Sequence, residues 1–358
     1  MDIVLKIDSQ VFQGWEKVSV SRTMEALAGS FSFDMVRSSP EAADAVQVGK
    51  SAQISIVDGQ REAQILDGFI DTRKRNNDTS GIKISITGRD KTADLVDCSA
   101  IVTSSSWARV TLKKLCEDIL APFSLTVEDY TGGVDPLIGF TMQPGDTAHS
   151  LIETACRARG VLPLSDRWGN LTLVNSTGQT RADENLEYGR NLKNLSVDEN
   201  NADRFSRYIV KGQADTGGSG WDATSIQFKG EAADKYVTRY RPLILNAEGK
   251  PTAASVKRRA AWEAQVRAGR AVSYSAQVQG WIQNPDAGIS SAFMPWDINQ
   301  VVNVRHPLYD INTDLLITGV EYTRDDSGTI TNLTLNHPDT YRADPAGGFD
   351  SMPAAKGW

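Results

Sequence analysis

The sequence predicts a mainly β protein in which two homologous antiparallel β-barrels flank a small α/β domain. Three observations support this prediction. Apolar and polar residues alternate through both ends of the chain, as in strands with one buried face. The middle of the chain instead repeats its apolar residues every three to four positions, as helices do. The length of 358 residues also exceeds the roughly 250–300 that one hydrophobic core accommodates.

The first barrel is predicted at residues 1–98. Asp58-Gly59 is typical of a hairpin turn between two strands. Five or six short strands separated by Gly, Asn and Asp favour a small antiparallel barrel or sandwich. The clearest alternation occurs in four segments: residues 18–21, 30–35, 52–57 and 82–87.

The α/β domain is predicted at residues 99–176. Residues 107–123 carry an apolar stripe of helical period, which Pro122 ends. A second helix is expected to begin at an N-cap, Asp146, and to end at Gly160. A hairpin with strands at residues 161–164 and 171–174 completes the domain.

The second barrel is predicted at residues 177–342, with a helix inserted at residues 252–269. Three glycines favour a loop at residues 213–221. Residues 343–358 are expected to form an extended tail. Strands are expected at six segments: residues 205–211, 236–240, 271–278, 300–305, 315–322 and 330–335.

An internal repeat relates the two β-rich regions. Residues 65–73 (ILDGFIDTR) align without a gap with residues 316–324 (LITGVEYTR), so that Gly68 corresponds to Gly319. A Ser-Gly turn and another alternating strand follow both copies. Any two antiparallel hairpins share some of this spacing, but the common glycine and arginine favour duplication. Three chains with two related modules each would display six modules around one axis.

Composition and charge exclude several classes of protein. A net charge of −7 and a pI near 5.2 argue against a broad surface for DNA phosphates. The chain lacks the apolar run of a transmembrane helix and the pattern of a secretory signal, so folding in a cytoplasm is expected. Cys98, Cys116 and Cys156 form no CxxC pair and are expected to be buried thiols.

A series of short motifs occurs in the order known from one protein family. The motifs are WEKV at residues 15–18, GSFSF at 29–33, DGFID at 67–71, GRDKTADLVDC at 88–98, QPGDTA at 143–148, RFSRY at 204–208, KGQ at 211–213 and GW at 280–281. In these motifs the chain resembles the baseplate hub proteins of contractile phage tails. It is most similar to the Mu-like tail hubs, within the superfamily that includes the late control D proteins and the heads of type VI secretion spikes.

The resemblance implies a non-enzymatic structural protein of the virion tail baseplate, assembled in the cytoplasm of the host bacterium. A homotrimer with pseudo-sixfold symmetry would join the hexameric tail tube protein to the trimeric spike protein, contact other baseplate proteins and let DNA pass during host entry. No cofactor, stable nucleic-acid binding or membrane insertion is implied. Type VI spikes continue into a long needle, whereas this chain ends soon after the second barrel. The spike is therefore expected on a separate polypeptide.

Catalytic and metal-binding patterns are sparse, so no catalytic, cofactor or metal residue is predicted. The histidines, His149, His306 and His337, have no metal-ligand spacing and no G-x-S-x-G motif accompanies them. Glu117-Asp118 and Glu153 lie on predicted helices, where carboxylates are usually solvated, although paired carboxylates can cleave cell-wall glycans. A tail-associated cell-wall hydrolase and a type VI-like secretion spike component remain alternatives.

Six residues are predicted to contact partner chains. Gly68, Phe69, Gly319 and Val320 belong to the repeated hairpins, which we expect to face the tail tube. Trp296 and Trp358 lie in or beside loops and are expected at interfaces, because aromatic side chains are enriched at interface centres.

Overall fold

The computed structural model describes residues 1–8, 10–37, 46–78, 81–175, 178, 180–215, 225–247, 252–284, 293–325 and 328–341. The predicted tail at residues 343–358, including Trp358, lies outside the described residues.

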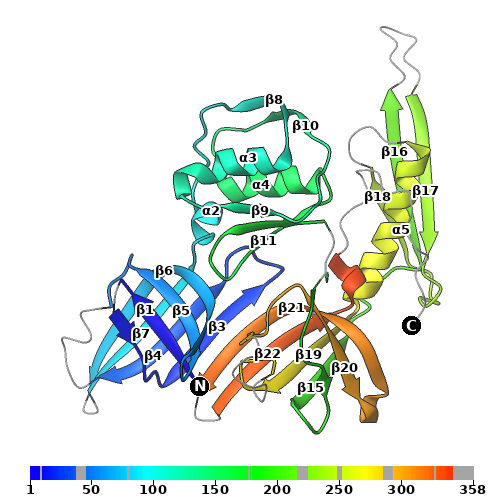
Figure 1. Cartoon of the computed structure of the whole chain (residues 1–358). Helices are drawn as coiled ribbons and strands as arrows, with labels where there is room; N and C mark the ends of the chain where they lie inside the picture. Colours follow the sequence, from blue (N-terminus) through cyan, green and yellow to red (C-terminus); the bar gives the residue numbers. More distant parts are fainter. Residues whose placement is uncertain are drawn as a thin grey trace.

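Most strands form one 14-stranded sheet that runs through both β-rich ends of the chain (Figure 1). Its order is β15-β19-β22-β21-β3-β4-β7-β6-β5-β1-β2, and β20 pairs with β13, β14 and β21. The two ends of the chain meet where β3 pairs with β21. The strands are β1 (Asp2–Ile7), β2 (Gln10–Phe12), β3 (Lys17–Thr23), β4 (Ser30–Arg37), β5 (Ser51–Asp58), β6 (Arg61–Asp78), β7 (Gly81–Asp90), β13 (Thr180–Arg181), β14 (Leu186–Glu187), β15 (Leu192–Glu199), β19 (Val272–Gln279), β20 (Gln300–His306), β21 (Ile311–Asp325) and β22 (Gly328–Asn336).

The mainly β class is confirmed, but among the described residues no strand pairing closes either half into a barrel. One apolar core instead extends beneath both halves of the sheet, from Phe33 and Ile54 to Val304 and Leu335. Alternation in a sequence specifies which side chains of a strand are buried, but it does not specify the neighbouring strand. The pairing of β3 with β21 therefore could not be predicted from the pattern.

The predicted repeat is present in the strand registers, but its residues correspond differently. Asp71 is a bulge in β6, between the pairs Ile70↔Gly88 and Thr72↔Thr87. Thr318 occupies the same place in β21, between Ile317↔Leu335 and Gly319↔Thr334. Gly319 thus corresponds to Thr72, four positions after Gly68. A shift of four residues preserves the alternation of buried and exposed side chains, so the sequence alignment could not detect it.

The residues that precede β5 and β20 also correspond in the two copies of the repeat. Gly49 and Asn299 precede β5 and β20 and both have left-handed backbones, with φ of 82° and 63°. Their N–H groups donate to the carbonyls of Ile70 and Ile317, each at 2.8 Å. The order β3-β4-β7-β6 in the first half corresponds to β15-β19-β22-β21 in the second. Each half therefore contains one copy of a four-strand module.

The middle of the chain folds around a separate core above the sheet (Figure 1). The two amphipathic helices bury Leu115, Ile119 and Ile152. The first helix begins later than predicted, because residues 107–110 pair with β10 as a strand. We call this part of the chain the middle domain. The elements of the middle domain are α2 (Ala93–Asp97), β8 (Ser106–Val110), α3 (Leu112–Leu120), the 3₁₀ helix η1 (Ala121–Phe123), β9 (Val127–Asp129), β10 (Leu137–Thr141), α4 (Ala148–Arg157), β11 (Leu162–Ser165) and β12 (Leu171–Val174).

The N-cap of α4 is Thr147, one residue after the predicted cap. Its hydroxyl oxygen accepts the Ser150 N–H at 3.1 Å. The Asp146 carboxylate instead accepts the Gln143 N–H at 2.8 Å and closes the preceding turn.

A further unit projects from the second half of the chain (Figure 1). It consists of the sheet β17-β16-β18 and helix α5 (Ala253–Arg270), which has a capping box at Thr252 and Ser255. A Cβ on Gly230 would lie 2.2 Å from the Val256 carbonyl oxygen, so this glycine lets the helix approach the sheet closely. The strands are β16 (Arg207–Asp215), β17 (Ser225–Ala233) and β18 (Pro242–Asn246); the 3₁₀ helices η2 (Pro307–Tyr309) and η3 (Pro338–Tyr341) occur later in the chain.

Two predictions in this unit were wrong. The strand expected at residues 236–240 is a turn, because Asp234 accepts the Tyr236 N–H at 3.0 Å and pairs with Arg204 at 2.5 Å. Residues 213–215 of the expected 213–221 loop belong to β16, and the rest of that loop lies outside the described residues. The helix predicted at residues 252–269 is confirmed.

The cysteine prediction was only partly right, because Cys98 is exposed whereas Cys116 and Cys156 are buried. Among the described helices, none has the length and apolar character needed to cross a membrane.

Alanine substitutions distinguish the two glycines that the sequence alignment equated. A Cβ on Gly68 would lie 1.9 Å from the Arg89 carbonyl oxygen, which the β6–β7 ladder holds in place. At Gly319 the nearest atom is Thr334 Cβ, at 3.2 Å. Gly68→Ala should therefore lower the free energy of unfolding by about 1–3 kcal/mol, measured by urea denaturation, and Gly319→Ala by clearly less. Equal losses would contradict the shifted correspondence.

Candidate functional site

The exposed face of the continuous sheet carries a row of hydroxyl side chains. Residues directly opposite each other on neighbouring strands share a face, and Thr72, Thr87, Ser32, Ser19 and Thr323 are opposite one another in turn. The row crosses the β3–β21 pairing without interruption. We call this surface the hydroxyl face.

The second half of the chain repeats the hydroxyl face. Ser196, Ser275 and Thr334 are opposite one another on β15, β19 and β22. By their registers they correspond to Ser19, Ser32 and Thr87. Two related rows therefore lie on one sheet, as expected of a surface made of repeated modules.

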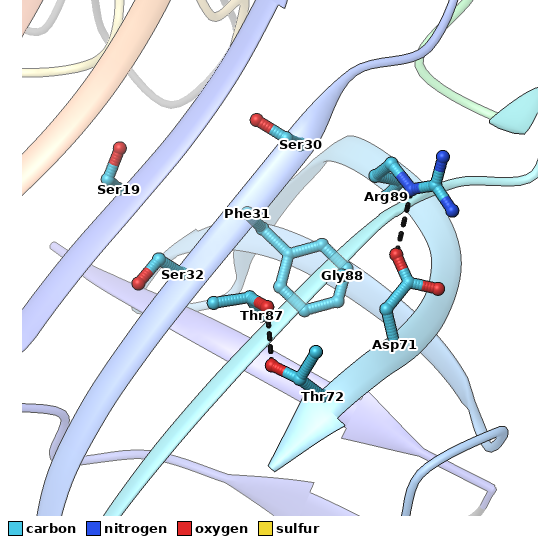
Figure 2. A pocket seen from close by; sticks show the side chains of 9 residues that line it. All are labelled: Ser19, Ser30, Phe31, Ser32, Asp71, Thr72, Thr87, Gly88 and Arg89. Carbon is cyan, nitrogen blue, oxygen red and sulfur yellow. Dashed lines mark hydrogen bonds and ion pairs between the residues drawn. The ribbon is translucent and has the colours of Figure 1, made fainter. Parts of the chain in front are cut away.

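A shallow hollow of about 420 Å³ lies on the hydroxyl face (Figure 2). The Thr72 and Thr87 hydroxyls are 2.7 Å apart across it. Arg89 at its rim donates to Asp71 at 2.8 Å and to Asp97 at 2.7 Å, and these bonds raise the pKa of Arg89. The one carboxylate and the one guanidinium that line the hollow, those of Asp71 and Arg89, therefore form an ion pair. The lining residues include no histidine or cysteine that could act as a base or nucleophile.

A buried polar cluster lies where three parts of the chain meet: the first half (β1–β7), the middle domain (α2–β12) and the second half (β13–β22). The Arg22 guanidinium on β3 donates to Asp297 at 2.6 Å and to the Ser165 carbonyl at 2.5 Å. Arg167 also pairs with Asp297, at 2.9 Å. The side chain of Arg22 is only 5% exposed. We call these four residues the junction cluster.

Asp90 extends the junction cluster toward the middle domain. Its carboxylate accepts the Gly29 N–H and the Ser165 hydroxyl, both at 2.8 Å, and the Thr92 hydroxyl at 2.6 Å. Burial raises the pKa of Asp90, and these hydrogen bonds act in the opposite direction. The cluster thus ties three parts of the chain together through buried hydrogen bonds and ion pairs.

The residues predicted from sequence to contact partners are mostly internal. Gly68, Gly319 and Val320 are buried, and Phe69 is half-buried. Trp296 is 1% exposed and its carbonyl accepts the Tyr322 hydroxyl. Their contact with other chains remains a prediction. The hydroxyl face was missed, although the Ser-Val-Ser and Ser-Phe-Ser segments signalled it through their alternation.

The candidate catalytic residues do not converge. His306 is 5% exposed, with its ring 4.6 Å from that of Tyr188 and 4.3 Å from that of Tyr309. Asp118 pairs with Lys114, and Glu153 with Arg157, on the surfaces of their helices. Within the described residues, no group of three or more metal-ligating side chains occurs.

Comparison with known proteins agrees with this architecture of repeated β modules. Three family models match: the N-terminal domain of Mu phage baseplate assembly protein GpP-like at residues 2–90, the second domain of baseplate hub protein gp44-like at residues 92–175, and the fourth domain of GpP at residues 252–344. The chain is 33% identical over 344 residues to baseplate hub protein gp44 of Escherichia phage Mu, covering 93% of this chain and 87% of the relative. The chain belongs to the phage baseplate hub protein family.

Solved structures support the assignment to this family of hub proteins. The 43 kDa tail protein of prophage MuSo2 from Shewanella oneidensis has a TM-score of 0.80 at 29% identity, covering 96% of this chain and 100% of that one. A tail protein from Neisseria meningitidis has the same fold, with a TM-score of 0.78 at 18% identity over 96% and 98% of the two chains. The hub is thus a structural component of a phage tail.

The junction cluster should contribute strongly to the stability of the hub. Arg22→Met removes both guanidinium bonds and leaves the Ser165 carbonyl without that donor. Removing one partner of a buried ion pair costs about 3–5 kcal/mol, which urea denaturation should measure.

The matched control for Arg22→Met is Arg181→Met. Arg181 pairs with Asp314 at 2.7 Å, but both side chains are about half exposed. Its loss should cost less than about 1 kcal/mol. If the two substitutions were equally costly, the junction cluster would not be what holds the three parts together.

Proposed function

We propose that this hub protein forms a homotrimeric ring that joins a hexameric tail tube to a trimeric central spike. The observation that carries the proposal is the four-strand module, which occurs twice in each chain with the same strand order and registers. Three chains would present six modules. A ring of six similar modules matches a sixfold partner, although each chain is present only three times.

Other parts of the hub favour a threefold partner on the opposite side. The α/β domain and the β16–β18 unit with α5 each occur once per chain, and Figure 1 shows both above the continuous sheet. Three copies of each would give a threefold surface. We propose that this surface faces the spike and other baseplate proteins.

The contact with the tube is proposed for the repeated hairpins β6–β7 and β21–β22. Gly68, Gly319 and Val320 are buried in these hairpins and would shape them, whereas the half-buried Phe69 could reach a partner. Trp296 would support the second hairpin through Tyr322. Trp358 is proposed to contact the spike or a neighbouring hub chain.

The hydroxyl face is proposed to line the passage through the ring. Serine and threonine hydroxyls carry no positive charge that would bind DNA phosphates, and the whole chain carries a net charge of −7. DNA could then slide through during host entry without adhering. The hub would act by geometry alone, with no enzymatic step, and would assemble in the host cytoplasm.

The oligomeric state of the purified hub tests this function. Light scattering should give the mass of three chains, either for the hub alone or after addition of the spike protein. Electron microscopy of the same particles should show sixfold features at one end and threefold features at the other. A hub that stays monomeric both alone and with the spike would overturn the proposal.

A further inference from the structure

Among the strand edges that have no strand partner within the described part of the chain, two belong to the repeated four-strand modules. One is the edge of β6 from Asp71 onward, on the side where β5 pairs with the earlier residues of β6. The other is the edge of β15 that faces away from β19. Unpaired edges expose backbone N–H and C=O groups that can pair with another strand.

The repeat indicates which strands these edges fit. β6 corresponds to β21 and β15 corresponds to β3, since each pair has the same place and register in its module. Within the chain, β21 uses the edge in question to pair with β3. We infer that β6 of one chain pairs in the same way with β15 of a second copy. This inference rests on the proposed trimer and specifies its interface.

The pairing of β3 with β21 within the chain also predicts the register of the pairing between chains. Val320 is opposite Arg22 and Glu321 is opposite Ser21. In the repeat, Arg73 of β6 corresponds to Val320, and Glu199 of β15 corresponds to Arg22. The first pair therefore becomes Arg73 opposite Glu199 of the second copy. The second pair becomes Lys74 opposite Asp198 of the second copy. Two basic side chains thus meet two acidic ones, although the register was derived from backbone pairing alone.

The burial of the corresponding residues agrees with a missing neighbour. Lys74, Asp198 and Glu199 are exposed, and Arg73 is half-buried with its guanidinium donating to the Val46 carbonyl. Val20 on β3 is fully buried beside β21, whereas its counterpart Val197 on β15 is half-buried. A strand added to β15 would complete the burial of Val197.

Charge also discriminates against the wrong pairings. An antiparallel pair of two β6 edges would bring basic side chains together, and a pair of two β15 edges would bring acidic ones together. Only the unlike pair places opposite charges across the ladder. Because the two edges differ, the contact is head-to-tail, and a head-to-tail contact that closes gives a ring.

Charge reversal tests the predicted pair. Lys74→Glu and Asp198→Lys should each weaken trimer formation at least about tenfold, measured as the trimer–monomer dissociation constant by light scattering across a dilution series, because like charges would be opposed. The double variant should recover most of the lost affinity. Lys113→Glu, an exposed site on α3 with the same change of charge, is the matched control and should leave association unchanged.

Cross-linking tests the register independently of the charges. In a Cys98→Ser background, which removes the exposed native thiol, Lys74→Cys with Asp198→Cys should give disulfide-linked chains on oxidation. Lys74→Cys with Asn194→Cys, displaced along β15, should not. Circular dichroism verifies that every variant is folded.

The results separate this inference from the proposed function. A wild-type trimer that tolerates both single charge reversals and gives no specific cross-link would overturn the β6–β15 interface alone. A wild-type hub that never trimerises, even with the spike, would overturn the ring and the interface together.

Discussion

The pairing of β3 with β21 is the constraint on which the rest of the hub depends. It joins strands that are about 300 residues apart in sequence, from Gly319↔Thr23 to Arg324↔Val18. Through it two four-strand modules become one sheet over one apolar core, and the hydroxyl face continues from one module to the next. The same pairing, used between the free edge of β6 in one chain and the free edge of β15 in the next, would close three sheets into a ring.

The junction cluster holds β3 and β21 in a fixed position relative to the middle domain. Arg22 lies on β3 itself and bonds to the segment before β20 and to β11 of the middle domain. The two terminal guanidinium nitrogens of Arg22 donate to acceptors in the other two parts, so displacing either part would leave a buried charged group without that partner. A rigid chain suits a structural hub, because any flexibility at the junction would be multiplied around a ring.

The sequence was informative where local rules apply and uninformative where distant residues meet. Composition rich in Ala, Lys and Arg predicted α5, and the Gly169-Asn170 turn predicted the 161–174 hairpin. The ungapped alignment of residues 65–73 with 316–324, extended by the Ser-Gly turns, revealed the repeat. The four-residue displacement of Gly319 escaped detection because an even shift leaves the alternation intact. The strand expected at residues 236–240 failed because Asp234 binds the local backbone. The junction cluster could not be foreseen, since Arg22, Ser165 and Asp297 are brought together only by the fold. The edge charges were visible in the sequence, but their significance required the register.

In the assembled hub, one kind of strand junction would be used twice: β3 with β21 within a chain, and β6 with β15 between chains. Hydrogen–deuterium exchange on the assembled hub tests it most directly. Backbone amides of β6 after Asp71 and of β15 should exchange rapidly in the dissociated chain. In the assembled hub they should become as protected as those at the β3–β21 junction. Edges that exchange equally fast in both states, beside a protected β3–β21 junction, would contradict it.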